Sequence, residues 1–305
     1  MKRNAMNRIV RAHEIVRARR AGFTLVEVMI ALVLTAIIGA AVTSVFVSQS
    51  AFYDEQQKIT AARAVSRAAT NMLLTELRAV ETSNGVIAAG ADSLVVRVPY
   101  ALGIACGTNL TTLHVSVLPV DSVVYAQASF AGYAWHDATS SAYTYVEGAG
   151  TTITDVAGAS RCTAPAGGDL PITTFTAAGE RGHVIGLTPV MAGAVPHASA
   201  VLLYQRVTYR FANSVIVPGQ RGLWREAQGS GFGAEELAAP FDPSARFRFY
   251  VLNASVAQDA PPADLTQIRG IELVLTGRSE RPDSDGAYSR TTPMTTAIFF
   301  RNRLD

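Results

Sequence analysis

The strongest candidate for chemistry in this sequence is an acid at the border of an apolar segment. Glu27 is followed by 26 residues, Val28 to Tyr53, without a charged side chain. A carboxylate in a bilayer costs about 2.5–3.5 kcal/mol even on lenient scales, so Glu27 needs a cation or a route to water. If the chain were cut after Gly22, the new α-amino group of Phe23 would lie four residues away, in this subunit or a neighbour. Alternatively, Glu27 reaches the membrane interface by itself, as charges near span ends often do.

Two cysteines, Cys106 and Cys162, lie beyond the apolar segment. Neither has a second cysteine or a histidine at zinc-ligand spacing, so they predict no metal site. In an oxidising compartment, a disulfide between them would stabilise the fold by roughly 4 kcal/mol in the chain-entropy model. Two separate buried thiols are the alternative, because pairing cannot be read from sequence.

The other candidate groups give little support for catalysis. The scattered histidines match no zinc pattern, and no nucleophile elbow or phosphate-binding glycine loop occurs. The Asp-Ser-Asp-Gly segment at residues 283–286 resembles the opening of a calcium loop, but later acidic ligands are missing, so we expect a turn. Trp135 and Trp224 are expected in the core rather than in a sugar or protein contact. The sequence therefore predicts no cofactor, no metal and no enzymatic activity.

Charge is divided unevenly along the chain. Residues 1–22 hold seven of the 26 lysines and arginines but one of the 24 acidic residues. Without this segment the 305-residue chain would be mildly acidic, so its overall charge argues against nucleic acid as a partner. With 49% apolar residues, the chain can bury a substantial core.

A long predicted helix positions Glu27. The uncharged run exceeds the ~30 Å hydrocarbon core in α-helical form, and the arginines before it place the amino end in the cytoplasm. No proline precedes Pro99, and the first stop signal is the glycine of Asn84-Gly85, so we expect one helix of about 60 residues. Its second half is amphipathic and should pack on a soluble domain, although a juxtamembrane coiled coil is the alternative. The predicted stripe comprises Phe52, Ile59, Ala62, Val65, Ala69, Met72 or Leu73, Leu77 and Val80.

Residues 19–27, Arg-Arg-Ala-Gly-Phe-Thr-Leu-Val-Glu, resemble the prepilin processing signature of type IV pilins and type II secretion pseudopilins. The resemblance implies that prepilin peptidase cuts between Gly22 and Phe23 and methylates the new amine of Phe23. It also implies that Glu27 neutralises the amino terminus of a neighbouring subunit during assembly. Two features depart from the pattern: the helix lacks the proline common in major pilins, and the leader is long unless translation starts at Met6.

Weaker similarity extends into the rest of the chain. Residues 206–211 and 222–226 resemble a strand pair of J-type minor pseudopilins and PilW-like minor pilins. Residues 268–275 and 298–303 resemble the last strands of PilW-like chains. This resemblance favours a PilW-like minor pilin, with a J-type pseudopilin as the neighbouring possibility.

Beyond Gly85 the pattern changes to strands and turns. Alternation or β-branched residues predict strands at Leu94–Val98, Thr112–Leu118, Val123–Ser129, Tyr143–Val146, Val201–Phe211, Leu223–Ala227, Arg246–Leu252, Ile271–Thr276 and Thr296–Arg301. Residues 147–170 and 253–267 are low in complexity and should be surface loops. The fold class is therefore α+β, with an antiparallel sheet packed on the amphipathic half of the helix.

The expected organisation has four parts: a cleaved leader at 1–22, a transmembrane half-helix at 23–53, an amphipathic half at 54–82 and a β-rich head at 83–305. The protein should begin in the inner membrane, with its amino end cytoplasmic and its head periplasmic, and later reach the pilus or cell surface. Expected partners are other minor pilins, the major pilin, prepilin peptidase, the assembly platform and membrane lipid.

These features favour a structural function, namely a minor pilin that helps to initiate or cap a filament, because the head is bulky for a repeated subunit. A minor pseudopilin of a type II secretion system is the alternative within this class. A tip adhesin is a further alternative from the class of binding modules. A membrane-tethered hydrolase is disfavoured, because no nucleophile and base pair is visible.

Overall fold

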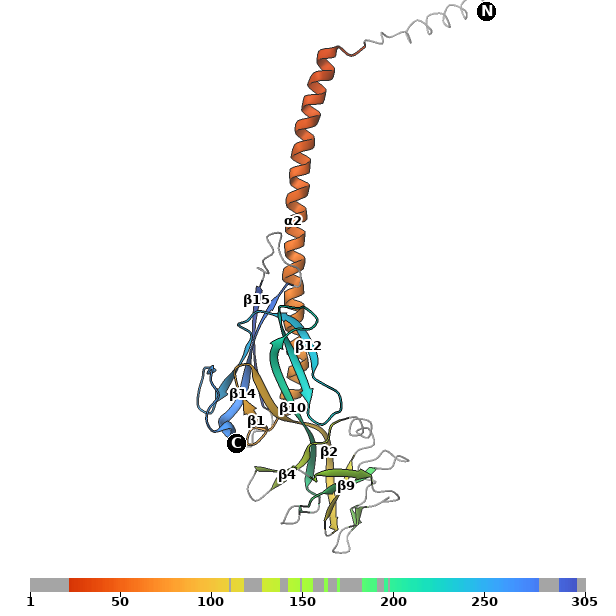
Figure 1. Cartoon of the computed structure of the whole chain (residues 1–305), viewed down its shortest axis with the longest axis vertical. Helices are drawn as coiled ribbons and strands as arrows, with labels where there is room; N and C mark the ends of the chain where they lie inside the picture. Colours follow the sequence, from red (N-terminus) through yellow and green to blue (C-terminus); the bar gives the residue numbers. More distant parts are fainter. Residues whose placement is uncertain are drawn as a thin grey trace, which may run out of the picture. The chain divides into compact units, whose positions relative to one another are not determined.

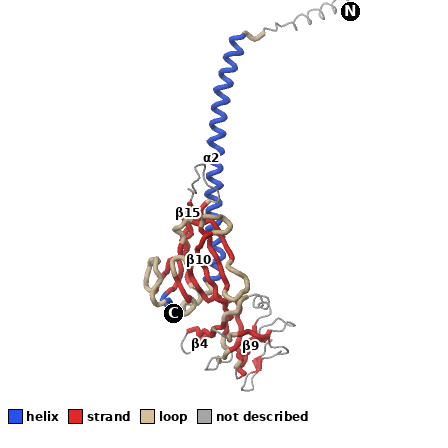
Figure 2. The backbone as a smooth tube through the Cα atoms, in the orientation of Figure 1, coloured by secondary structure: helices blue, strands red, loops and turns tan. Residues whose placement is uncertain are grey.

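The computed structural model describes residues 22–109, 111–117, 128–137, 142–148, 150–155, 162–163, 169–170, 183–190, 195–196, 198–279 and 291–300. A long helix, α2 (Leu25–Leu77), precedes a region built almost entirely of β-strands (Figures 1 and 2). The chain divides into two compact units, residues 1–56 and 57–305. Residues 1–21 of the predicted leader and the predicted turn at 283–286 lie outside the described residues.

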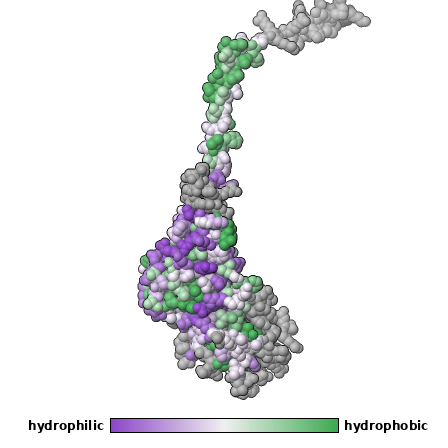
Figure 3. All heavy atoms as spheres, in the orientation of Figure 1, coloured by the Kyte–Doolittle hydropathy of each residue, from purple (hydrophilic) through white to green (hydrophobic). Residues whose placement is uncertain are grey.

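The first unit contains the uncharged part of α2. None of its described residues is buried, and the visible face of this segment is mostly apolar (Figure 3). Two of its hydroxyls are satisfied within the helix: those of Thr35 and Thr43 donate to the backbone oxygens of Ala31 and Gly39 at 2.7 and 2.8 Å. In the described part of the chain, α2 is the one helix long and apolar enough to cross a membrane.

The second unit contains the end of α2 and all the strands, which form one large sheet and a small pair. The strands of the first part are β1 (Val86–Ala89), β2 (Ser93–Asn109), β3 (Thr112–Val117), β4 (Gly132–Asp137), β5 (Ala142–Glu147), β6 (Thr152–Asp155), β7 (Cys162–Thr163), β8 (Asp169–Leu170) and β9 (His183–Thr188). Those of the second part are β10 (Ala200–Asn213), β11 (Arg221–Ala227), β12 (Glu235–Phe241), β13 (Arg246–Val251), β14 (Ile268–Arg278) and β15 (Thr291–Phe299). A short 3₁₀ helix, η3 (Leu265–Gln267), leads into β14.

All described strand pairings are antiparallel, and the large sheet runs β13-β14-β12-β11-β10-β2-β3-β9-β6. Strand β10 is its centre, because it pairs with β2 along one edge and with β11 and then β4 along the other. The sheet curves strongly, so that β13 returns to the start of β2, where the Phe247 N–H donates to Ala91 O at 2.8 Å. Beyond β14, β15 extends the sheet in the other direction.

The main core lies between the second half of α2 and the curved part of the sheet. Ala69, Leu73 and Leu77 from the helix are fully buried among apolar side chains of β2, β10, β11, β13 and β14. A leucine side chain stabilises the fold by about 1.5–3 kcal/mol when fully buried, and the methyl group of Ala69 by less. The helix approaches β14 closely at Gly277, where a Cβ atom would lie 2.1 Å from Ala62 O.

A second core lies farther along β2 and β10. It contains Leu113 and Val115 of β3, Tyr133 of β4, Ile185 of β9 and Leu203 of β10. Strands β2 and β10 therefore pass from one core to the other, which makes the head a two-core body on one continuous sheet. The lower part of Figure 1 shows this second group of strands around β4 and β9.

The predicted α+β fold class is confirmed: a long amino-terminal helix is followed by a large antiparallel sheet. The helix ends at Leu77 rather than at Asn84-Gly85, although no glycine or proline stops it there. The chain turns because Val80 is buried in the core and because the Glu81 carboxylate accepts the N–H groups of Ser83 and Asn84 at 2.7 and 3.0 Å. Tertiary packing thus overrides local helix propensity.

Most predicted strands are present, with longer bounds in several cases. The segment Leu94–Val98 is part of the 17-residue β2, and Thr296–Arg301 overlaps a strand that begins at Thr291. Val123–Ser129 is not confirmed: residues 123–127 lie outside the described residues, and 128 and 129 are not in a strand. The predicted loop 147–170 contains β6, because Thr152–Asp155 pairs with β9.

Candidate functional site

The predicted processing residues lie together at the beginning of α2. Gly22 and Phe23 precede the helix, and the Phe23 side chain is 84% exposed. Thr24 caps the helix: its hydroxyl accepts the N–H of Glu27 at 3.2 Å, while Oε2 of Glu27 accepts the N–H of Thr24 at 3.2 Å. This reciprocal arrangement is a capping box, which satisfies two amides that a helix otherwise leaves unpaired.

Glu27 therefore has a local function that the sequence analysis missed. The signal was the Thr24-x-x-Glu27 spacing, which matches the capping-box pattern directly before an apolar run. Oε2 also accepts the Thr24 hydroxyl at 3.2 Å, whereas Oε1 accepts no hydrogen bond from the described residues. The positive end of the helix dipole favours a carboxylate here as well. Glu27 is thus held in place by one oxygen while the other can bind a donor outside the helix.

Cys106 is buried near the end of β2 and is disulfide-bonded. Cys162, the other cysteine of the chain, is in β7, which lies beside β2 and β3. The side chain of Cys162 lies outside the described residues, so the pairing of these two cysteines stays a prediction. Such a bond would join β7 to the second core of the head.

A carboxylate on the helix is clamped by the sheet. Glu76 accepts hydrogen bonds from Nε of Arg225 at 3.1 and 3.2 Å and from the Tyr209 hydroxyl. Nη2 of Arg225 lies 3.0 Å from Oε1, so the ion pair is bidentate. This contact links α2 to β10 and β11 at a fixed register.

A second polar cluster joins the turn after α2 to the second group of strands. The buried carboxylate of Glu81 accepts the Tyr145 hydroxyl at 3.1 Å, and Arg97 lies over the Tyr145 ring and pairs with Glu147 at 2.5 Å. The hydrogen bond from Arg97 lowers the pKa of Glu147 below its ordinary range. Burial, together with the nearby negative charge of Glu81, raises the pKa of Tyr145. At neutral pH, Arg97 and Glu147 are therefore charged and the Tyr145 hydroxyl is protonated.

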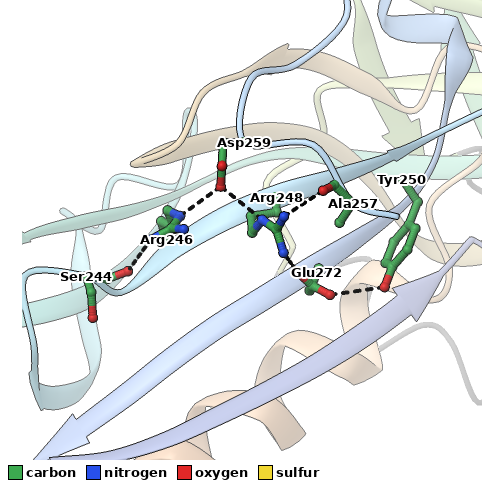
Figure 4. Close-up of polar contacts among 7 residues, drawn as sticks. All are labelled: Ser244, Arg246, Arg248, Tyr250, Ala257, Asp259 and Glu272. Atoms are coloured by element: carbon green, nitrogen blue, oxygen red, sulfur yellow. Dashed lines mark hydrogen bonds and ion pairs between the residues drawn. The ribbon is translucent and has the colours of Figure 1, made fainter. Parts of the chain in front are cut away.

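A third cluster lies on strands β13 and β14 (Figure 4). Oδ1 of Asp259 accepts hydrogen bonds from Arg246 and Arg248 at 3.1 and 2.9 Å, and Glu272 binds Arg248 and the Tyr250 hydroxyl. Hydrogen bonding from Arg246 lowers the pKa of Asp259. Burial lowers the pKa of Arg248, but Glu272 and Asp259 outweigh it and leave that pKa raised. The cluster fastens the segment before η3 onto the sheet.

These clusters have structural geometry rather than that of a catalytic centre. Their ions are paired and bridge separate elements of the head. Glu76, Tyr209 and Arg225 also line a pocket between α2 and the sheet, but there the carboxylate is held by the arginine and the tyrosine hydroxyl. Among the described residues, no group of three or more histidine, cysteine or acidic side chains could hold a metal ion. Trp135 is buried in the second core and Trp224 is half-buried on β11.

Comparison with known proteins agrees with the geometry at the start of α2. The family model described as the prokaryotic N-terminal methylation motif matches residues 17–43, which include Gly22, Phe23, the capping box and the first part of the uncharged helix. No match was found among curated proteins or among solved structures. The motif supports a type IV pilin-like or pseudopilin-like protein that is processed by prepilin peptidase and anchored in the inner membrane by this helix.

Proposed function

We propose that this protein is a minor pilin, similar to the PilW-like class, which joins other pilins through its amino-terminal helix at the start or tip of a type IV pilus. The observation that carries the proposal is the methylation motif at residues 17–43, which includes the start of an apolar, exposed half-helix. Such a helix face requires lipid or other helices around it. The large two-core head supports a minor role, because a repeated subunit of this bulk is harder to pack into a filament.

In the proposed mechanism, cleavage after Gly22 frees the α-amino group of Phe23, which is then methylated. The capping box holds the Glu27 carboxylate at the first turn of α2. Its Oε1 is then available for the ammonium group of a neighbouring subunit. Both charges lie in an environment of low dielectric constant, where each is costly alone and a pair is strongly favoured over either isolated ion.

Substitutions at the capping box separate its two functions. Glu27→Gln keeps the hydrogen bonds of a capping box but removes the charge, whereas Thr24→Val weakens the cap and keeps the charge. We expect Glu27→Gln and Glu27→Ala to abolish incorporation into pili and Thr24→Val to reduce it mildly, as measured by immunoblot of sheared filaments. Normal incorporation of Glu27→Gln would contradict the proposed ion pair.

A minor pseudopilin of a type II secretion system would carry the same motif. Deletion of the gene distinguishes the two assignments. Loss of surface pili and twitching, with exoprotein export intact, supports the pilus function. Retained pili with lost export would overturn it in favour of the secretion system.

A further inference from the structure

A pocket opens between the second half of α2 and the neighbouring strands β11 and β12. Its volume is about 320 Å³, which is within the range of small-molecule sites. Met72 of the helix and Leu237 of β12 are its apolar side chains. The rest of the lining is polar and consists of Thr75, Glu76, Tyr209, Arg225 and Glu235. All of these residues belong to the second compact unit, so the pocket is formed within that unit.

Glu235 is the carboxylate of this pocket that lacks a cation. It lies directly opposite Arg225 in the pairing of β11 with β12, which is the position of a cross-strand ion pair. Arg225 turns instead toward α2, where its Nε and Nη2 bind Glu76. Glu235 is exposed and has neither a hydrogen bond nor an ion pair with any residue that the structure describes. The helix therefore takes the cation of the strand pair, and one negative charge is left without a partner.

The hydroxyl groups of the pocket are available as acceptors rather than as donors. The Tyr209 hydroxyl donates to Glu76, and the Thr75 hydroxyl donates to the backbone oxygen of Asn71 at 3.1 Å. Both oxygen atoms keep lone pairs that can accept a hydrogen bond. Two carboxylates and one guanidinium group also give the lining an excess of one negative charge. An anion would be repelled from this pocket, whereas a cation with several N–H groups would find acceptors.

We propose that this pocket binds a primary ammonium group at the end of an aliphatic chain, which is the chemistry of a lysine side chain. The ammonium group donates to the carboxylate of Glu235, and the methylene groups pack on Met72 and Leu237. An ammonium group has three donors and no acceptor, so it matches a pocket whose unused groups accept. The same group occurs on a lysine of another chain and on a free polyamine. These are two sources of one ligand chemistry.

Covalent trapping of an added amine tests this inference. The full chain, purified in detergent, is treated with n-butylamine and a carbodiimide, which joins a carboxylate to a nearby amine as an amide. Peptide mass spectrometry compares the yield of adduct at Glu235 with the yield at Glu226. Glu226 is the matched control because it follows Arg225 on β11 and therefore lies on the opposite face of the sheet. We expect the ratio of the two yields to be at least fivefold higher with n-butylamine than with methylamine, which has no chain to pack on the apolar side chains.

Equal ratios for the two amines would overturn the inference. Met72→Ser removes one apolar side chain of the pocket without opening the core, since Met72 is 48% exposed. It should lower the ratio for n-butylamine to within twofold of the ratio for methylamine. An undiminished ratio in this variant would place the bound amine outside the pocket and contradict the inference as well.

Carbodiimide treatment of native membranes without added amine distinguishes the two sources of the ligand. A Glu235 peptide joined to a lysine of another chain would assign the ligand to a protein partner. A Glu235 peptide joined to a polyamine would assign it to a small molecule. Recovery of Glu235 with neither adduct would contradict the inference. The proposed pilin function does not depend on this pocket, so such a result would leave it intact.

Discussion

The two halves of α2 share one helical backbone but differ in what surrounds them. None of the described residues before residue 57 is buried, whereas six residues of the second half are: Ala62, Ser66, Ala69, Thr70, Leu73 and Leu77. The first half is apolar all round and needs lipid or other subunits as its environment. The second half packs against apolar side chains of the sheet in the same chain. We therefore expect assembly to depend on the first half of α2, and the stability of the head on the second.

The largest expected effect comes from the helix residue at the centre of the main core. Leu73→Ala removes a fully buried side chain and should lower the free energy of unfolding by about 2–5 kcal/mol. The neighbouring Met72 is 48% exposed, so Met72→Ala should change the free energy of unfolding by less than about 0.5 kcal/mol. Denaturant unfolding of the full chain in detergent, followed by the fluorescence of Trp135 and Trp224, measures both. Similar losses in the two variants would contradict the helix orientation.

A matched substitution in the first half sharpens the contrast. Leu34 is 54% exposed and far from either core in sequence. Leu34→Ala should therefore leave the unfolding midpoint of the head unchanged. A loss comparable with that of Leu73→Ala would show that the first half also contributes to the folded head.

The close approach of helix and sheet gives the next effect. Gly277→Ala places a methyl group against the backbone oxygen of Ala62, so the helix or β14 must shift. Overpacking of this kind costs about 1–3 kcal/mol. The same unfolding experiment detects it, and Gly233→Ala is a suitable control because the space around Gly233 is open. An unchanged midpoint for Gly277→Ala would place the helix farther from the sheet.

The ion pair between Glu76 and Arg225 should contribute less. Both side chains are partly exposed, at 28% and 20%, so solvent screening reduces the effect of Glu76→Gln to about 1 kcal/mol. A double-mutant cycle with Arg225→Gln isolates the pair from other effects. A coupling energy near zero would mean that the clamp does not fix the register of α2.

The smallest effect is a dependence on pH. Because Arg97 lowers the folded-state pKa of Glu147, this pair stabilises the head fully above the unfolded-state pKa of about 4.3. The contribution is lost as the pH falls through the lower, folded-state pKa. Unfolding midpoints between pH 6 and pH 3 should therefore fall less steeply for Glu147→Gln than for the unsubstituted chain. If the midpoints of the two proteins fell equally steeply, carboxylates other than Glu147 would be responsible for the loss of stability in acid.

The sequence was most informative where structure depends on neighbours along the chain. Glycine, phenylalanine and glutamate at positions 22, 23 and 27, followed by an uncharged run, define the amino-terminal site without any long-range contact. The Thr24–Glu27 cap was not predicted, although its spacing matches the capping-box pattern. The α+β fold class also followed from the pattern of apolar residues, which changes from a helical period to the alternation of strands after Gly85.

The head was harder to predict because its details depend on distant residues. The helix ends at Leu77 because Glu81 is captured by amides and by Tyr145 from β5, 64 residues away in sequence. Ser66 was not expected on the buried face, yet its hydroxyl donates to Leu275 O of β14 at 3.2 Å. A buried polar side chain of this kind is stabilised by a hydrogen bond to a distant strand, and the pattern of apolar residues does not predict such a bond.

Mass spectrometry of the mature amino terminus is the most direct check on the proposed processing of this protein. The protein is purified from native membranes, and its first peptide is sequenced. We expect a chain that begins at Phe23 with a methylated α-amino group, because the methylation motif at residues 17–43 includes the predicted cleavage position after Gly22. A purified chain that still carries residues 1–22, or one that begins at another position, would contradict it.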